Sequence, residues 1–230
     1  MKTPLEINRE YSNSYIQKTG EDNIPDIIKE ILRNDNSIKT IIDLGCGDGG
    51  FINSVKTFDY SKKVTGVDIS QRRIENLKNK FPKDKFYVAD VCNTKIKDKF
   101  YLVYSSQVIE HVEDDKKMIN EMKKLINPEG YLYVSSVIKK PWAIYKYKNR
   151  FGKFALDPTH EREYSSAKEF LDLFKEDFKL INYKIFPVKR KFFGFEIIIP
   201  GYYIIEGLWR KRIKKHSFIN NKKRFLFHLL

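Results

Sequence analysis

A glycine-rich turn at residues 43–50 is the segment whose residue types point most clearly to chemistry. The β-branched run Thr40–Ile42 leads into Asp43, and a glycine-dense stretch follows at once. Glycines let a backbone approach a bound molecule closely, and open α/β sheets bind ligands at the carboxyl ends of their strands. The pattern therefore predicts a strand that ends at a ligand. It leaves the ligand open, because these glycines also match the dinucleotide pattern G-x-G-x-x-G.

Three acids follow three of the expected strands. Asp43 ends the first strand, Asp68 the second and Asp90 the third. Asp68 follows Asp43 by 25 residues, a spacing that suits an acid accepting hydrogen bonds from a ribose diol. We expect Asp90 to accept from an adenine amino group. Asp43 could hold a positively charged end of the ligand, directly or through water.

The charges around the turn select between nucleotide ligands. A pyrophosphate prefers a turn without carboxylates, whereas Asp43 and Asp48 flank these glycines. A ligand with a ribose, an adenine and a cationic amino acid end fits better. S-adenosylmethionine (SAM) has all three groups, and a nicotinamide dehydrogenase would have no use for the third acid.

Three ordered motifs also carry a family resemblance. Residues 43–49 resemble the first motif of the class I SAM-dependent methyltransferases, while residues 67–70 and 88–91 resemble their ribose and adenine motifs. The resemblance covers about residues 22–186. It implies a Rossmann-like, doubly wound, mostly parallel seven-stranded sheet with a terminal antiparallel strand. The cofactor-binding residues that it implies are Asp43, Gly45, Cys46, Gly47, Gly49, Asp68, Ile69, Asp90, Val91 and Gln107.

The stretch 104–112 resembles the Glu-His loop of ubiquinone-biosynthesis O-methyltransferases and of small-RNA 3′-terminal 2′-O-methyltransferases. Metal-dependent members carry E-x-x-E-H, whose carboxylates and imidazole hold a divalent ion. Gln107 replaces the first glutamate here, so we assign no metal ligand and keep a divalent metal as the alternative. Without a metal, His111 is a candidate general base, since the usual pKa of histidine lies near working pH, and Glu110 is a further candidate catalytic residue. A purely structural role, with Glu110 opening the loop and His111 capping it, is the other alternative.

A second histidine, His160, lies in the stretch 157–165. Many members of this broad group carry a similar His-x-Arg-x-Tyr/Phe stretch that faces the acceptor pocket. The resemblance implies that His160 is a second base candidate and that Arg162 and Tyr164 bind the acceptor. A stabilised turn before the next helix is the alternative. Trp142, in an aromatic and basic segment, is the third candidate for acceptor binding.

Alternating patterns along the chain predict the elements that must position these residues. Strand and helix signals alternate after residue 38, which is typical of a parallel, doubly wound sheet. Ser70 and Asp114 are suited to cap two of the helices. We expect strands at 39–44, 63–69, 85–89, 100–105 and 130–137, helices at 21–33, 50–57, 70–80, 114–126 and 165–174, and a late antiparallel pair at 178–186 and about 191–199.

These elements divide into three parts. Residues 1–38 form an N-terminal helical segment covering the site, and residues 39–186 form the SAM-binding core. Residues 138–162 interrupt the alternation and are expected to form a cap over the site. Residues 187–230 are expected to form a basic, aromatic C-terminal extension.

The charge is concentrated in that last part. The chain has a net charge of +14, and residues 187–230 contribute much of it because they hold 11 Lys and Arg but only two acids. The apolar run 197–209 is too short and interrupted for a transmembrane helix, which needs about 20 apolar residues. Followed by Arg210–Arg212, it suits peripheral contact with an anionic membrane. A final strand and helix at the sheet edge, with a solvated basic tail, is the alternative.

Two cysteines, Cys46 and Cys92, are expected to be reduced thiols of a cytoplasmic protein, since the N-terminus has no apolar signal region. We expect O-methylation of a small-molecule or lipid-linked acceptor. One alternative is an RNA methyltransferase whose basic tail grips phosphates. The other is a non-catalytic SAM-binding subunit, which the retained Glu110, His111 and His160 argue against.

Overall fold

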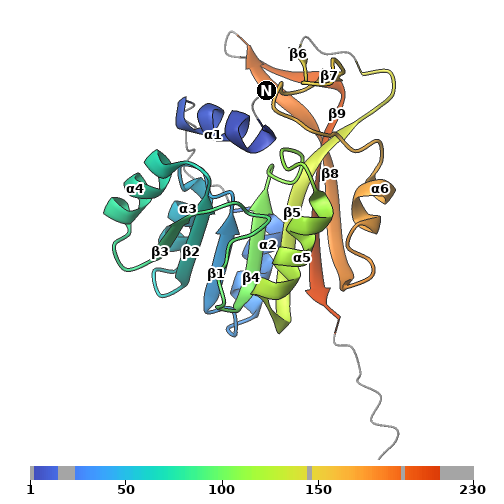
Figure 1. Ribbon diagram of the computed structural model, residues 1–230. Coiled ribbons are helices and arrows are strands. Elements are labelled where there is room, and N and C mark those ends of the chain that lie inside the picture. Colours follow the sequence, from blue (N-terminus) through green and yellow to red (C-terminus); the bar gives the residue numbers. More distant parts are fainter. Residues whose placement is uncertain (1–2, 15–23, 144–146, 193–194, 213–230) are drawn as a thin grey trace, which may run out of the picture.

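A seven-stranded sheet in the order β3-β2-β1-β4-β5-β9-β8 forms the centre of this computed structural model (Figure 1). The structure describes residues 3–14, 24–143, 147–192 and 195–212. The first five strands are parallel to one another, and β9 runs antiparallel to both of its neighbours. This confirms the predicted fold. The strands are β1 (Thr40–Leu44), β2 (Lys63–Asp68), β3 (Lys85–Val88), β4 (Phe100–Ser106), β5 (Ile126–Lys139), β8 (Phe178–Phe192) and β9 (Phe195–Lys211).

Helices cover both faces of this sheet, and each face has its own hydrophobic core. Buried side chains of α2, α3 and α4 pack into one cluster, while those of α5 and α6 pack into the other. Ser70 and Asp114 cap α4 and α5 as predicted, because their side chains accept backbone N–H groups of the first helical turn. The predicted helix start at residue 21 lies outside the described residues. The helices are α1 (Pro4–Ser14), α2 (Asp26–Asn34), α3 (Gly50–Phe58), α4 (Gln71–Lys80), α5 (Asp115–Leu125) and α6 (Ala167–Asp172).

The C-terminal strands correct the predicted boundary at residue 186. β8 continues to Phe192, and β9 lies inside the sheet between β5 and β8. Leu208 and Trp209 are each 1% exposed, because successive β9 side chains enter the cores on opposite faces. The apolar run 197–209 is therefore mostly a sheet strand, as in the alternative interpretation. The basic residues 213–230 lie outside the described part of the chain.

The predicted cap is a small unit at the end of the sheet where the parallel strands stop. Its strands β6 (Tyr147–Lys148) and β7 (Phe154–Ala155) pair antiparallel. A small cluster of Val137, Ala143, Leu156, Val188 and Tyr202 joins the cap to the β8–β9 hairpin. Helix α1 crosses the same end of the molecule (Figure 1). Within the described residues, no helix is both long and apolar enough to cross a membrane.

Candidate functional site

A cavity of about 580 Å³ opens where the parallel strands end. Its wall includes the glycine turn after β1, the segments that follow β2, β3 and β4, and residues 157–160. Side chains of α1 complete it from above, among them Asn8 and Tyr11. The sequence pattern of a ligand at the strand ends therefore coincides with an open cavity of a size that suits a small-molecule cofactor.

The glycine turn requires glycine at its first position. Gly45 has a φ of +78°, and a Cβ there would lie 2.4 Å from Cγ2 of Val108. The next glycine, Gly47, donates its backbone N–H to Oδ2 of Asp68 at 2.9 Å. Oδ1 of the same carboxylate accepts the Ser70 N–H at 2.9 Å, so both ends of Asp68 are held where β2 stops. These bonds fix the predicted ribose acid against the turn.

Asp43 lies beneath the turn rather than in the cavity wall. It is 3% exposed, and burial together with the nearby Asp68 raises its pKa well above the usual range. A cation bound over the turn would favour the ionised carboxylate and offset this shift. Its position therefore suits a long-range electrostatic contact.

Most of the other predicted cofactor residues do line the cavity. Cys46 and Gly49 do not: the Cys46 side chain packs near Gly66, and Gly49 precedes α3. Gln107 has a φ of +56°, and its side-chain amide donates to Ser135 Oγ at 3.3 Å. The predicted residues in the wall are Gly45, Gly47, Asp68, Ile69, Asp90, Val91 and Gln107.

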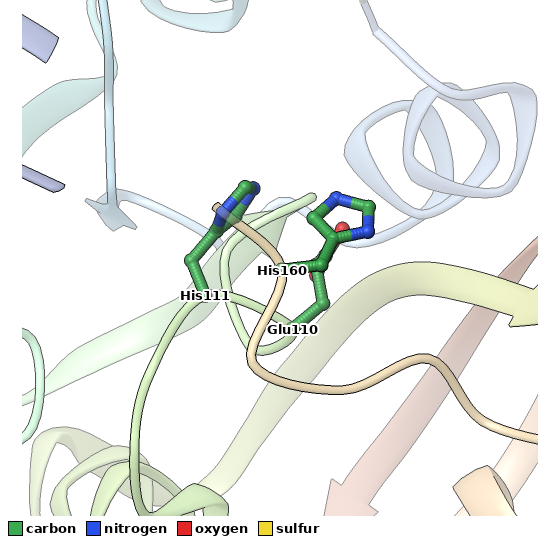
Figure 2. Close-up of side chains that lie close together, drawn as sticks. All are labelled: Glu110, His111 and His160. Carbon is green, nitrogen blue, oxygen red and sulfur yellow. The ribbon is translucent and has the colours of Figure 1, made fainter. Parts of the chain in front are cut away.

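The three candidate catalytic residues come together at one side of this cavity (Figure 2). Glu110, His111 and His160 each offer a ligand atom within 4.8 Å of the others, and the two imidazole centroids are 4.7 Å apart. Glu110 is fully buried. Its Oε2 accepts the Ser136 hydroxyl at 3.0 Å, while Oε1 has no hydrogen-bond partner among the described residues. A buried carboxylate oxygen without a partner is costly, and it suggests that a ligand completes the site.

A hydrogen-bond chain sets the tautomer of His111. The Thr159 hydroxyl lies 2.6 Å from Asp157 Oδ1 and 3.0 Å from His111 Nδ1. A carboxylate only accepts, so the one hydroxyl proton goes to Asp157, and Nδ1 of His111 must donate to Thr159. A neutral His111 then carries its lone pair on Nε2. Tyr11 of α1 lies 3.3 Å from the other oxygen of Asp157 and completes the chain.

The surroundings of His111 and His160 shift the pKa values of the two imidazoles in opposite directions. Burial, and then the neighbouring His160, lower the pKa of His111 well below its usual value. Burial also opposes a charge on His160, but Glu163, 2.7 Å from Nδ1, and Glu110 outweigh it and raise the pKa of His160. Burial raises the pKa of Glu110 to about 6. Neighbouring groups whose pKa values are driven apart are typical of acid–base sites.

Comparison with known proteins identifies the family. Residues 42–134 match the family model described as a methyltransferase domain. The chain is 27% identical over 190 residues to malonyl-[acyl-carrier protein] O-methyltransferase 1 of Ilyobacter polytropus, covering 80% of this chain and 66% of that protein. It is 31% identical over 104 residues to a ubiquinone biosynthesis O-methyltransferase of Coxiella burnetii, covering 43% of this chain and 44% of the relative.

The chain belongs to the class I SAM-dependent methyltransferases. Its fold also resembles that of N-methyltransferase NodS from Bradyrhizobium japonicum WM9, solved with S-adenosyl-l-homocysteine. The TM-score is 0.60 at 14% identity, and the match covers 92% of this chain and 100% of that one. SAM, the methyl donor of this family, is the cofactor that the glycine turn and its acids predict.

The three residues predicted to bind the acceptor of this methyltransferase lie elsewhere in the structure. Among the described residues, the cavity wall does not include Trp142, Arg162 or Tyr164. The Arg162 guanidinium instead donates to the backbone oxygens of Ile109, Val112 and Glu113, so it holds the loop that carries Glu110 and His111. Tyr164 is 3% exposed in a hydrophobic core, and Trp142 is 62% exposed. We therefore revise these three positions: two support the loop or the core, and Trp142 lies on the cap surface.

Other residues of this methyltransferase site gave no clear signal in the sequence. Asp157, Thr159 and Glu163 orient the two histidines, although the sequence presents them only as turn and helix-start residues. Arg73 lines the cavity, with its guanidinium 3.8 Å from Asp68. Asn8, whose amide donates to the His111 carbonyl at 2.8 Å, comes from a helix far away in sequence. Such contacts depend on tertiary packing that no local pattern encodes.

The resemblance also raised a divalent metal, and the donor atoms of Glu110, His111 and His160 fit one. One carboxylate and two imidazoles are donors that such ions accept, and Glu110 offers its unpartnered Oε1. Thr159 binds Nδ1 of His111 and Glu163 binds Nδ1 of His160, which leaves each Nε2 for an ion, as is usual around metal ligands. Glu110, His111 and His160 would hold the ion. The missing carboxylate at Gln107 does not prevent this, because His160 supplies a third ligand.

Proposed function

We propose that this protein transfers the methyl group of SAM to a hydroxyl oxygen of a small-molecule or lipid-linked acceptor. The observation that carries the proposal is the tautomer of His111. A neutral His111 has its lone pair on Nε2, and this side chain lies in the wall of the SAM cavity. A base at that place is what an alcohol needs when it becomes a nucleophile. The names of the two O-methyltransferase relatives support oxygen as the atom methylated.

Each part of SAM would then have a place along the cavity wall. With the ribose on Asp68 and the adenine beside Asp90, the amino acid end would lie over the glycine turn. The sulfonium would then face the segment 107–111. Holding the acceptor hydroxyl in line with the methyl carbon and sulfur accounts for much of the rate in such a transfer.

The reaction then needs one displacement and one proton transfer. The acceptor oxygen attacks the methyl carbon, and the carbon–sulfur bond breaks to leave neutral S-adenosylhomocysteine. The hydroxyl proton moves to Nε2 of His111. Asp157, acting through Thr159, stabilises the imidazolium that forms. Glu110 offsets the charge of the neighbouring His160, which would oppose it.

A divalent ion on Glu110, His111 and His160 is the alternative way to activate the hydroxyl. When bound, it would polarise the acceptor oxygen and lower the pKa of its proton. His111 would then be a ligand rather than the base. A chelator separates the two mechanisms, because it abolishes only the metal-dependent one.

Two other functions are weaker interpretations of the same chain. An RNA methyltransferase would use the excess of basic residues to hold phosphates. A non-catalytic SAM-binding subunit would have no need of the hydrogen-bond chain that orients His111. O-methylation explains both the cofactor cavity and the base beside it.

The test is an acceptor screen with methyl-labelled SAM. Hydroxylated small molecules, a lipid extract and short RNA are each incubated with the full chain, with and without a chelator. We expect label in a base-stable ether of a small or lipid-linked acceptor. Label confined to RNA would overturn the proposal, and so would label in amines alone.

A further inference from the structure

The end of the β8–β9 hairpin extends past the main sheet and exposes large apolar side chains. β5 pairs with β9 only as far as Lys139 and Tyr202, so the ribbon formed by residues 189–192 and 195–198 has no third strand among the described residues. On this ribbon Phe195 is 76% exposed, Ile197 46% and Ile198 53%. Neighbouring residues of a strand point to opposite faces, so Ile197 and Ile198 make the end of the ribbon apolar on both sides. Such a ribbon would contact a bilayer by its end rather than by one flat face.

The cap adds aromatic side chains at the same end of the molecule. Figure 1 shows β6 and β7 beside the end of the hairpin. A Cβ at Gly201 of β9 would lie 3.0 Å from the Trp142 ring, so this tryptophan sits against the hairpin. We call the exposed apolar residues of both segments the cap face. It consists of Trp142, Tyr147, Phe151, Phe154, Phe195, Ile197 and Ile198.

Basic side chains outnumber acidic ones around the cap face. Lys148 lies over the Phe154 ring at 5.4 Å, and Arg150, which also pairs with Glu161 at 2.7 Å, lies over Phe151 at 4.5 Å. Within residues 140–154 and 189–198 the sequence has a single acid, Glu196, which pairs with Lys189 at 3.1 Å. Exposed aromatic and aliphatic side chains with a basic surround are typical of surfaces that bind anionic bilayers.

The cap face also borders the cavity. Leu156, directly after β7, and Arg190, on the hairpin, both line the cavity wall. The Arg190 guanidinium lies 3.5 Å from the Leu156 carbonyl and links the two segments there. The cap face therefore lies beside the wall of the SAM cavity.

We propose that the cap face docks on an anionic lipid bilayer and holds the cavity at the membrane surface. This moves the membrane contact from the apolar run 197–209, most of which is buried in the sheet, to the ribbon end and the cap. Docking on a bilayer does not depend on the proposed O-methylation. Only the delivery of a lipid-borne acceptor to the cavity rests on the proposed function.

The two tryptophans give a direct readout of docking. Trp142 belongs to the cap face and is 62% exposed, whereas Trp209 is 1% exposed in the core. The full chain is mixed with vesicles of phosphatidylcholine alone or with about one-third phosphatidylglycerol. We expect co-sedimentation and a blue shift of tryptophan emission with the anionic vesicles, and loss of the shift in Trp142→Phe with sedimentation retained.

A matched pair of isoleucines tests the location. Ile198 is 53% exposed on the cap face, and Ile181 is 48% exposed on β8 away from it. We expect Ile198→Ser to lower partitioning to anionic vesicles about ten-fold, and the matched Ile181→Ser to change it less than two-fold. SAM affinity, measured without vesicles, checks that each variant is folded.

Several results would overturn the docking proposal. They are absence of binding to anionic vesicles, equal losses in the Ile198 and Ile181 variants, and an emission shift that persists in Trp142→Phe. Tighter binding to a short single-stranded RNA, unaffected by Ile198→Ser, would also overturn it in favour of a nucleic acid. A chain that docks through Ile198 but methylates no acceptor would instead refute the proposed function alone.

Discussion

At the scale of single residues, two carboxylates at different depths define the SAM end of the cavity. Asp68 is fixed in the wall by two backbone N–H groups, and Asp43 is buried under the turn. The first can accept hydrogen bonds from a ribose, while the second can act on a cation only through its charge. Each role predicts a different response to substitution.

Asp68→Ala should weaken SAM binding by about 1–3 kcal/mol, because the hydrogen bonds from the ribose are lost. Titration calorimetry measures the difference. Asp98→Ala is the matched control, since that carboxylate is solvent-exposed and pairs with Lys85 at 3.0 Å. Equal affinities for SAM in the two variants would contradict the role of Asp68.

Asp43 should couple SAM binding to proton release. Its raised pKa means that it holds a proton more readily in the free protein, and a bound cation favours the ionised form. SAM affinity should therefore rise as pH rises toward that pKa. The measured binding enthalpy should also vary with the ionisation enthalpy of the buffer, and Asp43→Asn should remove this variation. A buffer dependence that survives the substitution would refute the coupling.

The same scale shows how far residue types alone predict a site. The acids after β1, β2 and β3 could be placed from their spacing, because strand ends in such a sheet share one edge. The adjacency of His111 and His160 could not, since it depends on where the chain after β5 folds back. Arg162 carries the same group whether it holds a loop or binds an acceptor, and only packing distinguishes these roles.

At the scale of elements, β9 is the strand that most changes the interpretation of the sequence. Its Pro200, Gly201 and Glu206 interrupt an apolar run in a way that disfavours a core strand. The structure accommodates Glu206 because its carboxylate accepts the Tyr133 hydroxyl at 2.8 Å. That bond comes from a strand 73 positions earlier, so the sequence pattern could not reveal it.

Two substitutions along β9 test this division into core and exposed ends. Trp209→Ala should lower the free energy of unfolding by about 3–5 kcal/mol, because it leaves a large cavity between α6 and the sheet. Phe195→Ala, on the exposed ribbon, should change it by about 0.5 kcal/mol or less. Urea denaturation measures both. Similar losses would mean that β9 does not have one end in the core and the other outside it.

At the scale of the whole molecule, the sheet separates two hydrophobic cores and leaves its functional edge to loops, α1 and the cap. Alternating strand and helix signals were enough to predict this layout. They could not predict how the cap and α1 close over the strand ends, because neither segment has a partner that the local sequence identifies.

SAM should stabilise this whole assembly, since its contacts come from both sides of the cavity. At one hundred times its Kd, SAM should raise the free energy of unfolding by about 2.7 kcal/mol. Urea melts with and without SAM measure this, and S-adenosylhomocysteine should act similarly because it retains the ribose and adenine. A nicotinamide dinucleotide is the control, and equal stabilisation by it would contradict the choice of ligand at the glycine turn.

The most direct test of the proposed reaction is a single-turnover measurement on His111→Gln. Once the screen has provided an acceptor, methyl transfer from labelled SAM is followed in the wild-type chain and the variant, with SAM affinity measured in parallel. We predict that transfer falls by about 10²–10⁴-fold, the usual contribution of a general base, while SAM affinity changes less than two-fold. Undiminished transfer in His111→Gln would contradict the assignment of this histidine and the reaction built on it.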